Sequence, residues 1–309
     1  MRFVLKYAFC FSISVMSMQT SLAQGCSDAG FCSIGNLKQQ SADTTLQQQR
    51  LSIFLPVGTG DENVFVFTPA IQYDHQFSAK WSAQAKLTAN YASGNLGEAT
   101  GFGDVFLSGT YILTAKSSWR TSFSLGMKLP LNTGNLNAEG KSLPMQYQSS
   151  LGTIDVIAGG SITNDTWQFA AGWQQPISGT NQNNFLPASW NSADAHQYPP
   201  SRHFDRKGDV LLRVSYRLPV TKRLSVTGGA LGIYHLGEDT YIDAGVSDNP
   251  IAIQGSAGVT LNVTGMATWK ITEQLSMGLS AGIPFIVRDV RPDGLTRSFV
   301  VVPEITWRF

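Results

Sequence analysis

The stretch WRTSFSLGMKLPL, residues 119–131, decides the fold class of this chain. Its odd positions carry mainly large apolar side chains such as Phe123 and Leu125, and its even positions carry polar or small ones such as Ser122 and Ser124. Neighbouring side chains of a β-strand point to opposite faces. The period of two therefore predicts a strand with one apolar and one polar face.

The same alternation recurs almost to the end of the chain and divides it into about twelve segments. These are residues 47–57, 63–76, 80–92, 103–115, 119–132, 147–163, 166–178, 207–220, 223–237, 256–271, 275–288 and 296–309. About 9–11 residues suffice for a tilted strand to cross a bilayer, so each segment is long enough. A soluble sandwich alternates in the same way, and alternation alone does not separate the two classes.

The amino-acid composition favours a membrane protein over a soluble domain. The chain has 42% hydrophobic and 14% charged residues, whereas soluble domains carry roughly 25% charged residues. Beyond the first two dozen positions it has no apolar run of about 20 residues, which a membrane helix needs. This combination is typical of a transmembrane barrel with a polar lumen. The net charge of +1 does not favour nucleic acid as a partner.

The connections between the segments alternate in length. Short turns lie at residues 78–80, 116–118, 164–165, 221–222 and 272–274, and longer loops rich in Gly and Asn lie between them. Outer-membrane barrels have short periplasmic turns and long external loops. The sequence therefore predicts an all-β fold: a transmembrane antiparallel up-and-down barrel of about twelve strands in the bacterial outer membrane, with both ends in the periplasm and lipid around it.

Aromatic residues form two groups on the expected outward face. One group lies near the short turns: Tyr73, Trp81, Tyr111, Trp119, Trp167, Tyr216, Trp269 and Trp307. The other lies toward the long loops: Phe65, Phe67, Tyr91, Trp173, Tyr234, Phe285 and Phe299. This predicts an aromatic girdle at each membrane interface. The ending Trp307-Arg308-Phe309 resembles the signature that the barrel assembly machinery recognises, which makes this machinery an expected partner of the C-terminal strand.

The N-terminus predicts export. Basic residues precede an apolar stretch at 7–18, and small residues end at Ala23, so we expect a signal peptide at residues 1–23. Cys26 raises the alternative of a lipoprotein, but the residues before it fit a lipobox poorly. We expect a periplasmic N-terminal segment at 24–46 and the barrel at 47–309. The alternatives left open are that the N-terminal segment plugs the lumen and that the strand count differs by two.

Two cysteines remain after removal of the signal, Cys26 and Cys32. In an oxidising compartment this spacing predicts a local disulfide. No His is near in sequence, and we expect neither a metal site nor a cofactor.

The strand periodicity places a set of charged residues on the lumen wall: Arg50, Asp74, Lys86, Asp104, Arg120, Lys128, Asp155, Arg213, Arg217, Lys270, Arg288, Glu304 and Arg308, together with Asp209. One interpretation is that they pair with one another, because unpaired burial is costly. The other is a channel wall whose basic excess favours anions. The two interpretations are compatible.

The longest loop, residues 179–206, carries six aromatic or imidazole side chains: Phe185, Trp190, His196, Tyr198, His203 and Phe204. A loop of this length is functional or disordered. One hypothesis is that it folds inward as a constriction, and the alternative is an exposed external loop.

Catalysis has little support in the sequence. Asp74 and His75 are adjacent, so they point to opposite faces of a strand. His235 lies near the external rim with Glu238 and Asp239, but no Ser is tied to it by a motif. We expect no catalytic residues and no enzyme activity, with an outer-membrane hydrolase as the less favoured alternative.

Three motifs carry a family resemblance. They are TGFGDVFLSGTYIL at 100–113, GTIDVIAGG at 152–160 with the strand that follows it, and Gly208-Asp209 at the start of a strand. They resemble the Gly-Asp strand motifs of transporters in the family named for the meta-cleavage pathway of phenol degradation. The match spans about a third of the chain. It implies an outer-membrane channel for passive uptake of small, hydrophobic or aromatic solutes. A structural or surface-interaction barrel without transport is the alternative.

Overall fold

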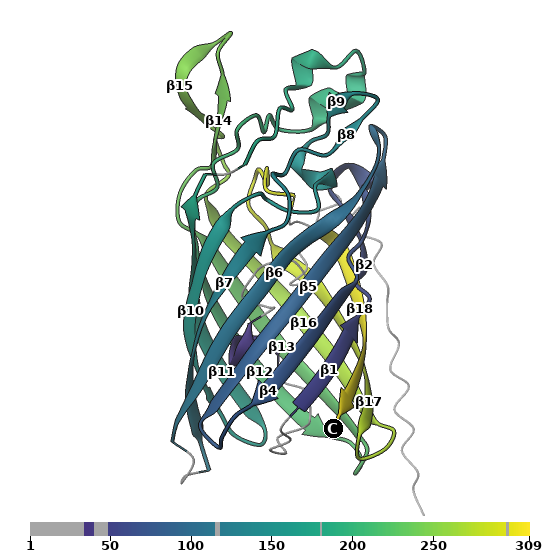
Figure 1. Cartoon of the computed structure of the whole chain (residues 1–309), viewed down its shortest axis with the longest axis vertical. Helices are drawn as coiled ribbons and strands as arrows, with labels where there is room; N and C mark the ends of the chain where they lie inside the picture. Colours follow the sequence, from purple (N-terminus) through teal and green to yellow (C-terminus); the bar gives the residue numbers. More distant parts are fainter. Residues whose placement is uncertain (1–33, 40–48, 115–117, 180, 295–296) are drawn as a thin grey trace, which may run out of the picture.

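The computed structural model describes residues 34–39, 49–114, 118–179, 181–294 and 297–309. Fourteen strand segments form one antiparallel sheet that closes into a barrel (Figure 1). The segments are β1 (Gln49–Phe54), β2 (Val57–Gly60), β3 (Phe65–Phe67), β4 (Ala70–Gln76), β5 (Trp81–Gly94), β6 (Gly97–Thr114), β7 (Arg120–Pro130), β10 (Ile154–Thr163), β11 (Trp167–Ser178), β12 (Asp209–Pro219), β13 (Leu224–His235), β16 (Gly258–Lys270), β17 (Leu275–Ile286) and β18 (Arg297–Arg308). The barrel closes where β1 pairs with β18.

Two barrel strands are interrupted at prolines. Pro56 separates β1 from β2, and Pro69 separates β3 from β4. Proline has no N–H to donate to the sheet, yet the ladder continues across both breaks. The Thr68 amide donates to the Pro56 carbonyl at 3.0 Å, and the Ala89 amide donates to the Pro69 carbonyl at 2.9 Å. The fourteen segments thus make twelve barrel strands, and the expected fold is confirmed.

The outer face of the barrel is apolar. On β7, Phe123 and Leu125 are 57% and 63% exposed, while Ser122 and Ser124 between them face inward and are buried. Apolar surface costs roughly 25 cal/mol per Å² when it is left in water, so this face requires lipid. Because closed barrels leave no strand edge unpaired in hydrocarbon, the protein is an outer-membrane barrel.

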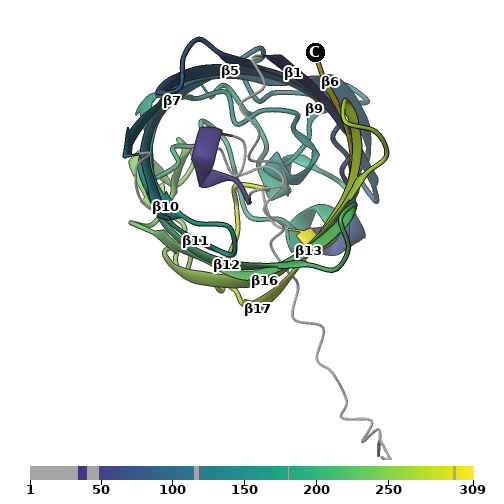
Figure 2. The same ribbon diagram turned by 90° about the horizontal axis from the view of Figure 1, so that it is seen from below.

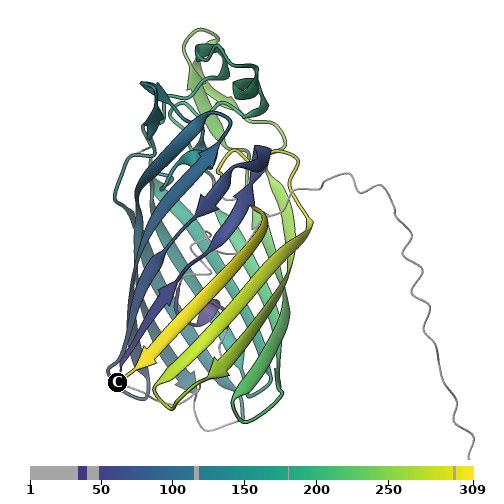
Figure 3. The same cartoon turned by 90° about the vertical axis from the view of Figure 1, so that its right-hand side faces the viewer.

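Aromatic pairs lie on the outer face at the short-turn end of the barrel. The rings of Trp81 and Tyr111 are 4.6 Å apart, and those of Trp167 and Tyr216 are 4.8 Å apart. Such amphipathic rings favour the headgroup level of a membrane. The barrel begins and ends at this same end, where the Phe309 amide donates to the Gln49 carbonyl (Figure 3).

The opposite end carries the long connections (Figure 1). They contain the hairpins β8 (Asn137–Ala138) with β9 (Lys141–Ser142) and β14 (Thr240–Asp243) with β15 (Ser247–Ala252), and the 3₁₀ turns η3 (Asp61–Asn63), η4 (Met145–Tyr147), η5 (Pro187–Ser189) and η6 (Ala193–Gln197). We call the described parts of connections 61–64, 131–153, 179–208, 236–257 and 287–294 the loop cap. Among the described residues, no helix is long and apolar enough to span a membrane.

Two expected strand boundaries differ from the structure by six or seven residues, more than the others. The segment 147–163 was expected to be one strand, but β10 begins only at Ile154 because Gly152, with φ +65°, turns the chain before it. Conversely, β6 begins at Gly97 rather than residue 103, because β5 and β6 remain paired up to Gly94 opposite Gly97. This hairpin extends the barrel wall beyond the expected membrane segments.

Candidate functional site in the barrel lumen

A short segment of the chain lies inside the barrel. Residues 34–39, which include the 3₁₀ turn η2 (Gly35–Leu37), lie in the lumen on the side of β6, β7, β10 and β11 (Figure 2). We call them the plug segment. The side chains of Ile34 and Leu37 are fully buried and pack against six inward-facing apolar residues: Phe106, Ile157, Ala170, Leu211, Leu231 and Ile233.

Glycines in the wall make room for the plug segment. A Cβ atom at Gly126 would lie 2.8 Å from Ile34 Cδ1, and one at Gly159 would lie 2.8 Å from Leu37 Cδ2. Gly35 itself has φ +43°, and a Cβ atom there would lie 2.5 Å from the Thr110 hydroxyl. Since this region of φ favours glycine, any other residue at position 35 strains the plug segment in this position.

Polar contacts hold the backbone of the plug segment to two opposite walls. The Gly35 amide donates to Gln84 Oε1 on β5 at 3.1 Å. From the other side, Arg213 Nη1 on β12 donates to the Leu37 carbonyl at 2.7 Å. Neighbouring β11 contributes Gln168 Nε2, which donates to the Lys38 carbonyl at 2.9 Å. The six residues are therefore fixed from both sides of the lumen.

This placement corrects one expectation. The whole segment 24–46 was expected in the periplasm, but residues 34–39 lie within the barrel because the lumen of a twelve-stranded barrel has apolar wall residues that they cover. The position of residues 34–39 agrees with the alternative that the N-terminal segment plugs the lumen. The expected signal peptide, Cys26 and Cys32 lie outside the described residues.

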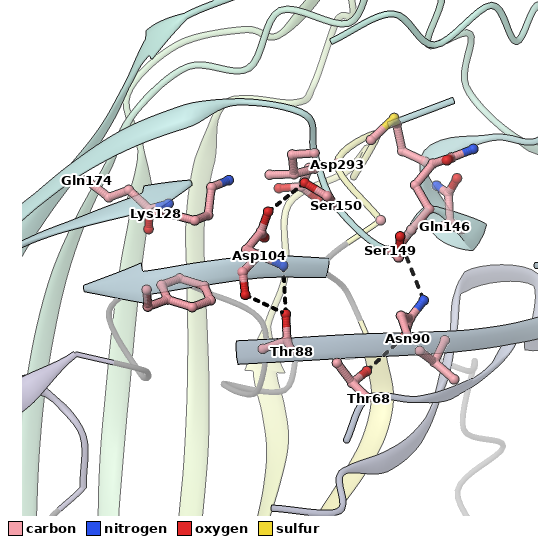
Figure 4. Close-up of a pocket in the computed structure, with 16 residues that line it drawn as sticks. Thr68, Thr88, Asn90, Asp104, Lys128, Gln146, Ser149, Ser150, Gln174 and Asp293 are labelled. Atoms are coloured by element: carbon pink, nitrogen blue, oxygen red, sulfur yellow. Dashed lines mark hydrogen bonds between the residues drawn. The ribbon is translucent and has the colours of Figure 1, made fainter. Parts of the chain in front are cut away.

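A small polar chamber lies between the plug segment and the loop cap (Figure 4). Its cavity volume is about 50 Å³, and its lining runs from Phe106, which contacts the plug segment, to Met145 in the loop cap. Hydrogen bonds order the wall: Ser150 donates to Asp104 Oδ1 at 2.6 Å, and the Asp104 amide donates to the Thr88 hydroxyl at 2.8 Å. A space of this size holds water or a very small polar group.

One side of the chamber carries a buried ion pair. Lys128 Nζ lies 3.1 Å from Asp155 Oδ2, and both side chains are almost fully buried. Thr153 accepts a hydrogen bond from Lys128 at 3.0 Å and donates to Asp155 at 2.6 Å, and Gln174 also donates to Asp155. Because every charge of this group has polar partners, the desolvation cost of burying the ions is offset.

The loop cap closes over the mouth through packed aromatic residues. Tyr147, Phe185 and Tyr198 are buried in one cluster, with the Tyr147 and Tyr198 rings 5.9 Å apart. Asn183 is fully buried and joins two connections, since its amide donates to the Gly134 and Leu143 carbonyls, both at 2.9 Å. These contacts give the loop cap a small core that it shares with the ends of β3, β5 and β6.

Where the loop cap meets the barrel, six charged or imidazole side chains form what we call the rim network: Arg206, Asp209, His235, Asp239, Arg288 and Asp293. Asp293 Oδ2 lies 2.9 Å from Arg288 Nη2 and 3.4 Å from Arg206 Nε. Burial raises the pKa of the Asp293 carboxyl, but the charges of Arg288 and Arg206 outweigh it and hold the pKa below its usual range. Asp293 thus stays ionised, and the rim network joins three loops to the barrel.

The geometry of His235 does not support the hydrolase alternative. Its Nδ1 lies 2.7 Å from Asp209 Oδ1, its Nε2 lies 2.8 Å from Asp239 Oδ1, and its side chain is 1% exposed. A catalytic triad uses one ring nitrogen for a carboxylate and the other for the nucleophile. Here both nitrogens contact carboxylates, so His235 links Asp209 to Asp239 at the rim of the barrel.

The charges expected on the lumen wall lie at several levels of the barrel. Lys128 and Asp155 form the chamber pair, Asp104 lines the chamber, and Arg288 and Asp209 belong to the rim network. Arg213 contacts the plug segment, Arg50 pairs with Asp74 at 3.1 Å, and Lys86 lies over the rings of Phe54 and Phe106. The registers place four more on the inner wall opposite buried polar residues or another wall charge: Arg120, Arg217, Lys270 and Arg308. Glu304 lies opposite Phe54 and Gly278 and accepts a hydrogen bond from Thr306.

The aromatic residues of the longest loop lie in or on the loop cap. Phe185, Tyr198 and Phe204 are buried in its clusters, and Trp190 packs against one of them. His196 and His203 are exposed. The loop packs against the other connections over the mouth rather than reaching the level of the plug segment.

Two sets of residues were not predicted from the sequence. The plug segment has one recognisable signal, because Ile34 and Leu37 flank a glycine in an otherwise polar lead. For the rim network, Arg206 and Asp293 lie in connections without regular periodicity. Their role follows only from the closure of the barrel, which brings residues 206 and 293 together.

Solved outer-membrane barrels share this fold. An outer membrane channel from Pseudomonas putida F1 superimposes with a TM-score of 0.60 at 11% identity, over 86% of this chain and 97% of that chain. The NanC porin gives 0.47 at 8% identity, over 84% and 98%. The CymD monoaromatic hydrocarbon channel gives 0.44 at 11% identity, over 93% and 98%. No protein-family model matches the sequence, and no curated protein matches it.

Proposed function

We propose that the protein is a gated outer-membrane channel for small molecules, closed in this conformation by its own plug segment. The observation that carries the proposal is that a six-residue segment lies inside the barrel and is held there by hydrogen bonds from β5 and from β12. A twelve-stranded barrel encloses more space than eight strands, whose side chains fill the interior. A barrel with only a structural role has no need for a lumen that a separate segment must occupy.

The contacts of the plug segment are of the size expected for a reversible gate. Burying Ile34 and Leu37 contributes about 1.5–3 kcal/mol each, and its polar contacts contribute about 0.5–1.5 kcal/mol each. Ordering six backbone residues costs about 1–2 kcal/mol per residue. The free energy gained from these contacts and the free energy lost on ordering the segment are similar. Thermal fluctuations can therefore displace the plug segment while the barrel strands remain paired.

The wall that the plug segment covers supports a solute with an apolar part. When the segment leaves, Ile157, Leu211 and Leu231 face an open lumen. This agrees with the small hydrophobic or aromatic solutes implied by the sequence resemblance. Basic side chains outnumber acidic ones toward the short-turn end of the wall, which favours anions over cations: Arg50, Arg120, Arg217, Lys270 and Arg308 against Asp74 and Glu304.

A reversible crosslink tests the gate. A Cβ atom at Gly35 lies 3.3 Å from Ser124 Cβ, close to the spacing of about 3.5–4.5 Å in disulfides. The variant Gly35→Cys/Ser124→Cys is made with Cys10, Cys26 and Cys32 replaced by Ser, and single-channel conductance is recorded in planar bilayers. Oxidised protein should show no conductance steps, and reduction should produce them.

Two outcomes would contradict the proposal. If the reduced protein is folded but never conducts, the barrel is not a channel. If oxidised and reduced proteins conduct equally, the plug segment is not the gate. The alternative of a structural barrel is favoured by one observation, the packed loop cap over the mouth, and it predicts the first of these outcomes.

A further inference from the structure

A hollow of about 780 Å³ lies in the outer face of the barrel, over strands β4, β5, β6 and β7, which lie side by side in Figure 1. Its floor consists of small residues on β5 and β6, namely Ala83, Ala85 and Gly109. Gly109 is paired with Ala83, and a Cβ atom at Gly109 would meet no atom within 4 Å. The floor is therefore open to whatever surrounds the barrel.

Large side chains form the two walls of this hollow. On one side lie the rings of Tyr73, His75 and Phe77, with the centroids of His75 and Phe77 4.5 Å apart. On the other side lie Leu125 and Met127 of β7. Neighbouring strands lie about 4.8 Å apart, so the two floor strands make a slot about 10 Å wide. The slot is an apolar groove that accepts extended hydrocarbon chains.

The register fixes the level of the hollow in the membrane. Trp81 and Tyr111 are paired across β5 and β6 and form one of the aromatic pairs at the short-turn end. Ala83 and Gly109 are the next outward-facing pair. Rings such as Trp81 and Tyr111 favour the headgroup level, so the hollow begins beside the periplasmic headgroups and extends into the hydrocarbon. It is continuous with the apolar outer face that contacts lipid.

Polar groups lie at the headgroup end of the hollow. The Tyr73 hydroxyl lies 3.2 Å from His75 Nδ1. When this hydroxyl donates to Nδ1, the proton of a neutral imidazole is on Nε2, which has no partner among the described residues. Lys80 is exposed in the turn between β4 and β5 and forms no ion pair within the described chain. An N–H donor and an ammonium are therefore available to an anion, and hydrogen bonds to ionised oxygens are the stronger ones.

We propose that this hollow binds one glycerophospholipid of the periplasmic leaflet. An acyl chain lies on the floor formed by Ala83, Ala85 and Gly109, and the phosphate accepts a hydrogen bond from His75 Nε2 and pairs with Lys80. A groove that is apolar along its length and binds an anion at its headgroup end matches this class of molecule. The proposal rests on the barrel fold and its lipid-facing surface, and it holds whether or not the lumen conducts.

A photoreactive phospholipid tests the site. The full-length protein in detergent is titrated with phosphatidylglycerol that carries a diazirine on one acyl chain, and labelled peptides are mapped by mass spectrometry after illumination. Labelling of β5 and β6 should saturate at a lipid concentration about tenfold lower than labelling of the outer face of β13 and β16. Unlabelled phosphatidylglycerol should compete. Diacylglycerol, which lacks the phosphate, should compete at least about tenfold more weakly.

Gly109→Phe fills the hollow and should abolish the saturable labelling of β5 and β6. Gly228→Phe is the matched control, because Gly228 is also exposed on a barrel strand and a Cβ atom there would meet no atom within 4 Å. It should leave the labelling of β5 and β6 unchanged. If Gly109→Phe does not fold, Ala83→Leu narrows the same floor and should weaken the labelling.

The headgroup contact is tested separately. His75→Phe keeps a ring in the wall but removes the donor, so it should weaken phosphatidylglycerol by about tenfold and leave diacylglycerol unchanged. Lys80→Gln should also weaken phosphatidylglycerol. Its matched control is Lys222→Gln, because Lys222 is exposed in the short turn after β12, and this variant should have no effect on the labelling of β5 and β6.

Three outcomes would overturn the proposal. Uniform labelling of the outer face without saturation would show that the hollow holds only exchanging membrane lipid. Equal effects of Gly109→Phe and Gly228→Phe, or equal competition by phosphatidylglycerol and diacylglycerol, would show that no phospholipid is recognised there. Recovery of a dimer that protects β5 and β6 from the lipid would assign the hollow to a second copy of the chain.

Discussion

The two closures of the lumen are built differently. The plug segment has two buried apolar side chains and a few hydrogen bonds to opposite walls. The loop cap has two buried clusters and is joined to the barrel by the rim network. Stability within a protein varies with the number of such buried contacts. The plug segment is therefore the closure that can be displaced without unfolding the barrel, while the loop cap is part of the folded barrel.

The largest expected effect is the removal of Asp293 from the rim network. Asp293→Ala leaves Arg206 and Arg288 buried without the carboxylate they share, which should lower the free energy of unfolding by about 3–5 kcal/mol. Urea unfolding in lipid vesicles measures this. Asp205→Ala is the control, because its pair with Lys207 is exposed and should be worth less than about 1 kcal/mol. Equal effects would show that the rim network does not stabilise the loop cap.

A second pair of variants compares the closures directly. Phe185→Ala opens a cavity in the loop cap and should lower the free energy of unfolding by about 3 kcal/mol. Leu37→Ala should lower it by less than about 1 kcal/mol, because a plug segment that detaches before the barrel unfolds contributes little to global stability. Urea unfolding measures both. A larger loss for Leu37→Ala would reverse the comparison between the closures.

A substitution at Gly35 should act on the plug segment alone. Gly35→Ala places a methyl group 2.5 Å from the Thr110 hydroxyl at φ +43°. The backbone strain alone is about 1–3 kcal/mol, which corresponds to about a tenfold larger population of the open channel. Single-channel open probability measures the change. Gly140→Ala is the matched control, since Gly140 has φ +76° with open space around it, and it should leave the open probability unchanged.

The smallest effect concerns pH and the loop cap. Asp61 pairs with Arg291 at 2.8 Å, yet burial raises the pKa of its carboxyl to about 6. The folded state then holds this proton more tightly than the unfolded state, so stability increases as pH falls through about 6 toward 4. Between pH 7 and pH 5 the gain should be about 1 kcal/mol.

The variant Asp61→Asn should lose this gain, which is read from the difference in unfolding free energy between the two pH values. Other groups titrate alike in both proteins and cancel. If the difference is the same in both proteins, burial of Asp61 does not couple the loop cap to pH.

The barrel was predictable because its signals are local. In β7 the contrast between Phe123 and Ser124 depends only on neighbouring positions, and the lipid-facing side follows from it. The boundary of β10 was less accessible, because Gly152 turns the chain where the alternation gives no break. The periodicity predicted that Arg213 faces the lumen, but it did not predict that Arg213 contacts Leu37.

The membrane class, the number of strands and the side chains that face the lumen could be predicted from the amino-acid order, because each depends on a period of two and on side-chain polarity. What lies inside the lumen became known only from the folded barrel. Arg213 contacts Leu37 across 176 positions of sequence, and Arg206 contacts Asp293 across 87. Such contacts arise when the sheet closes and brings distant strands around one space, and no local pattern encodes which residues then meet.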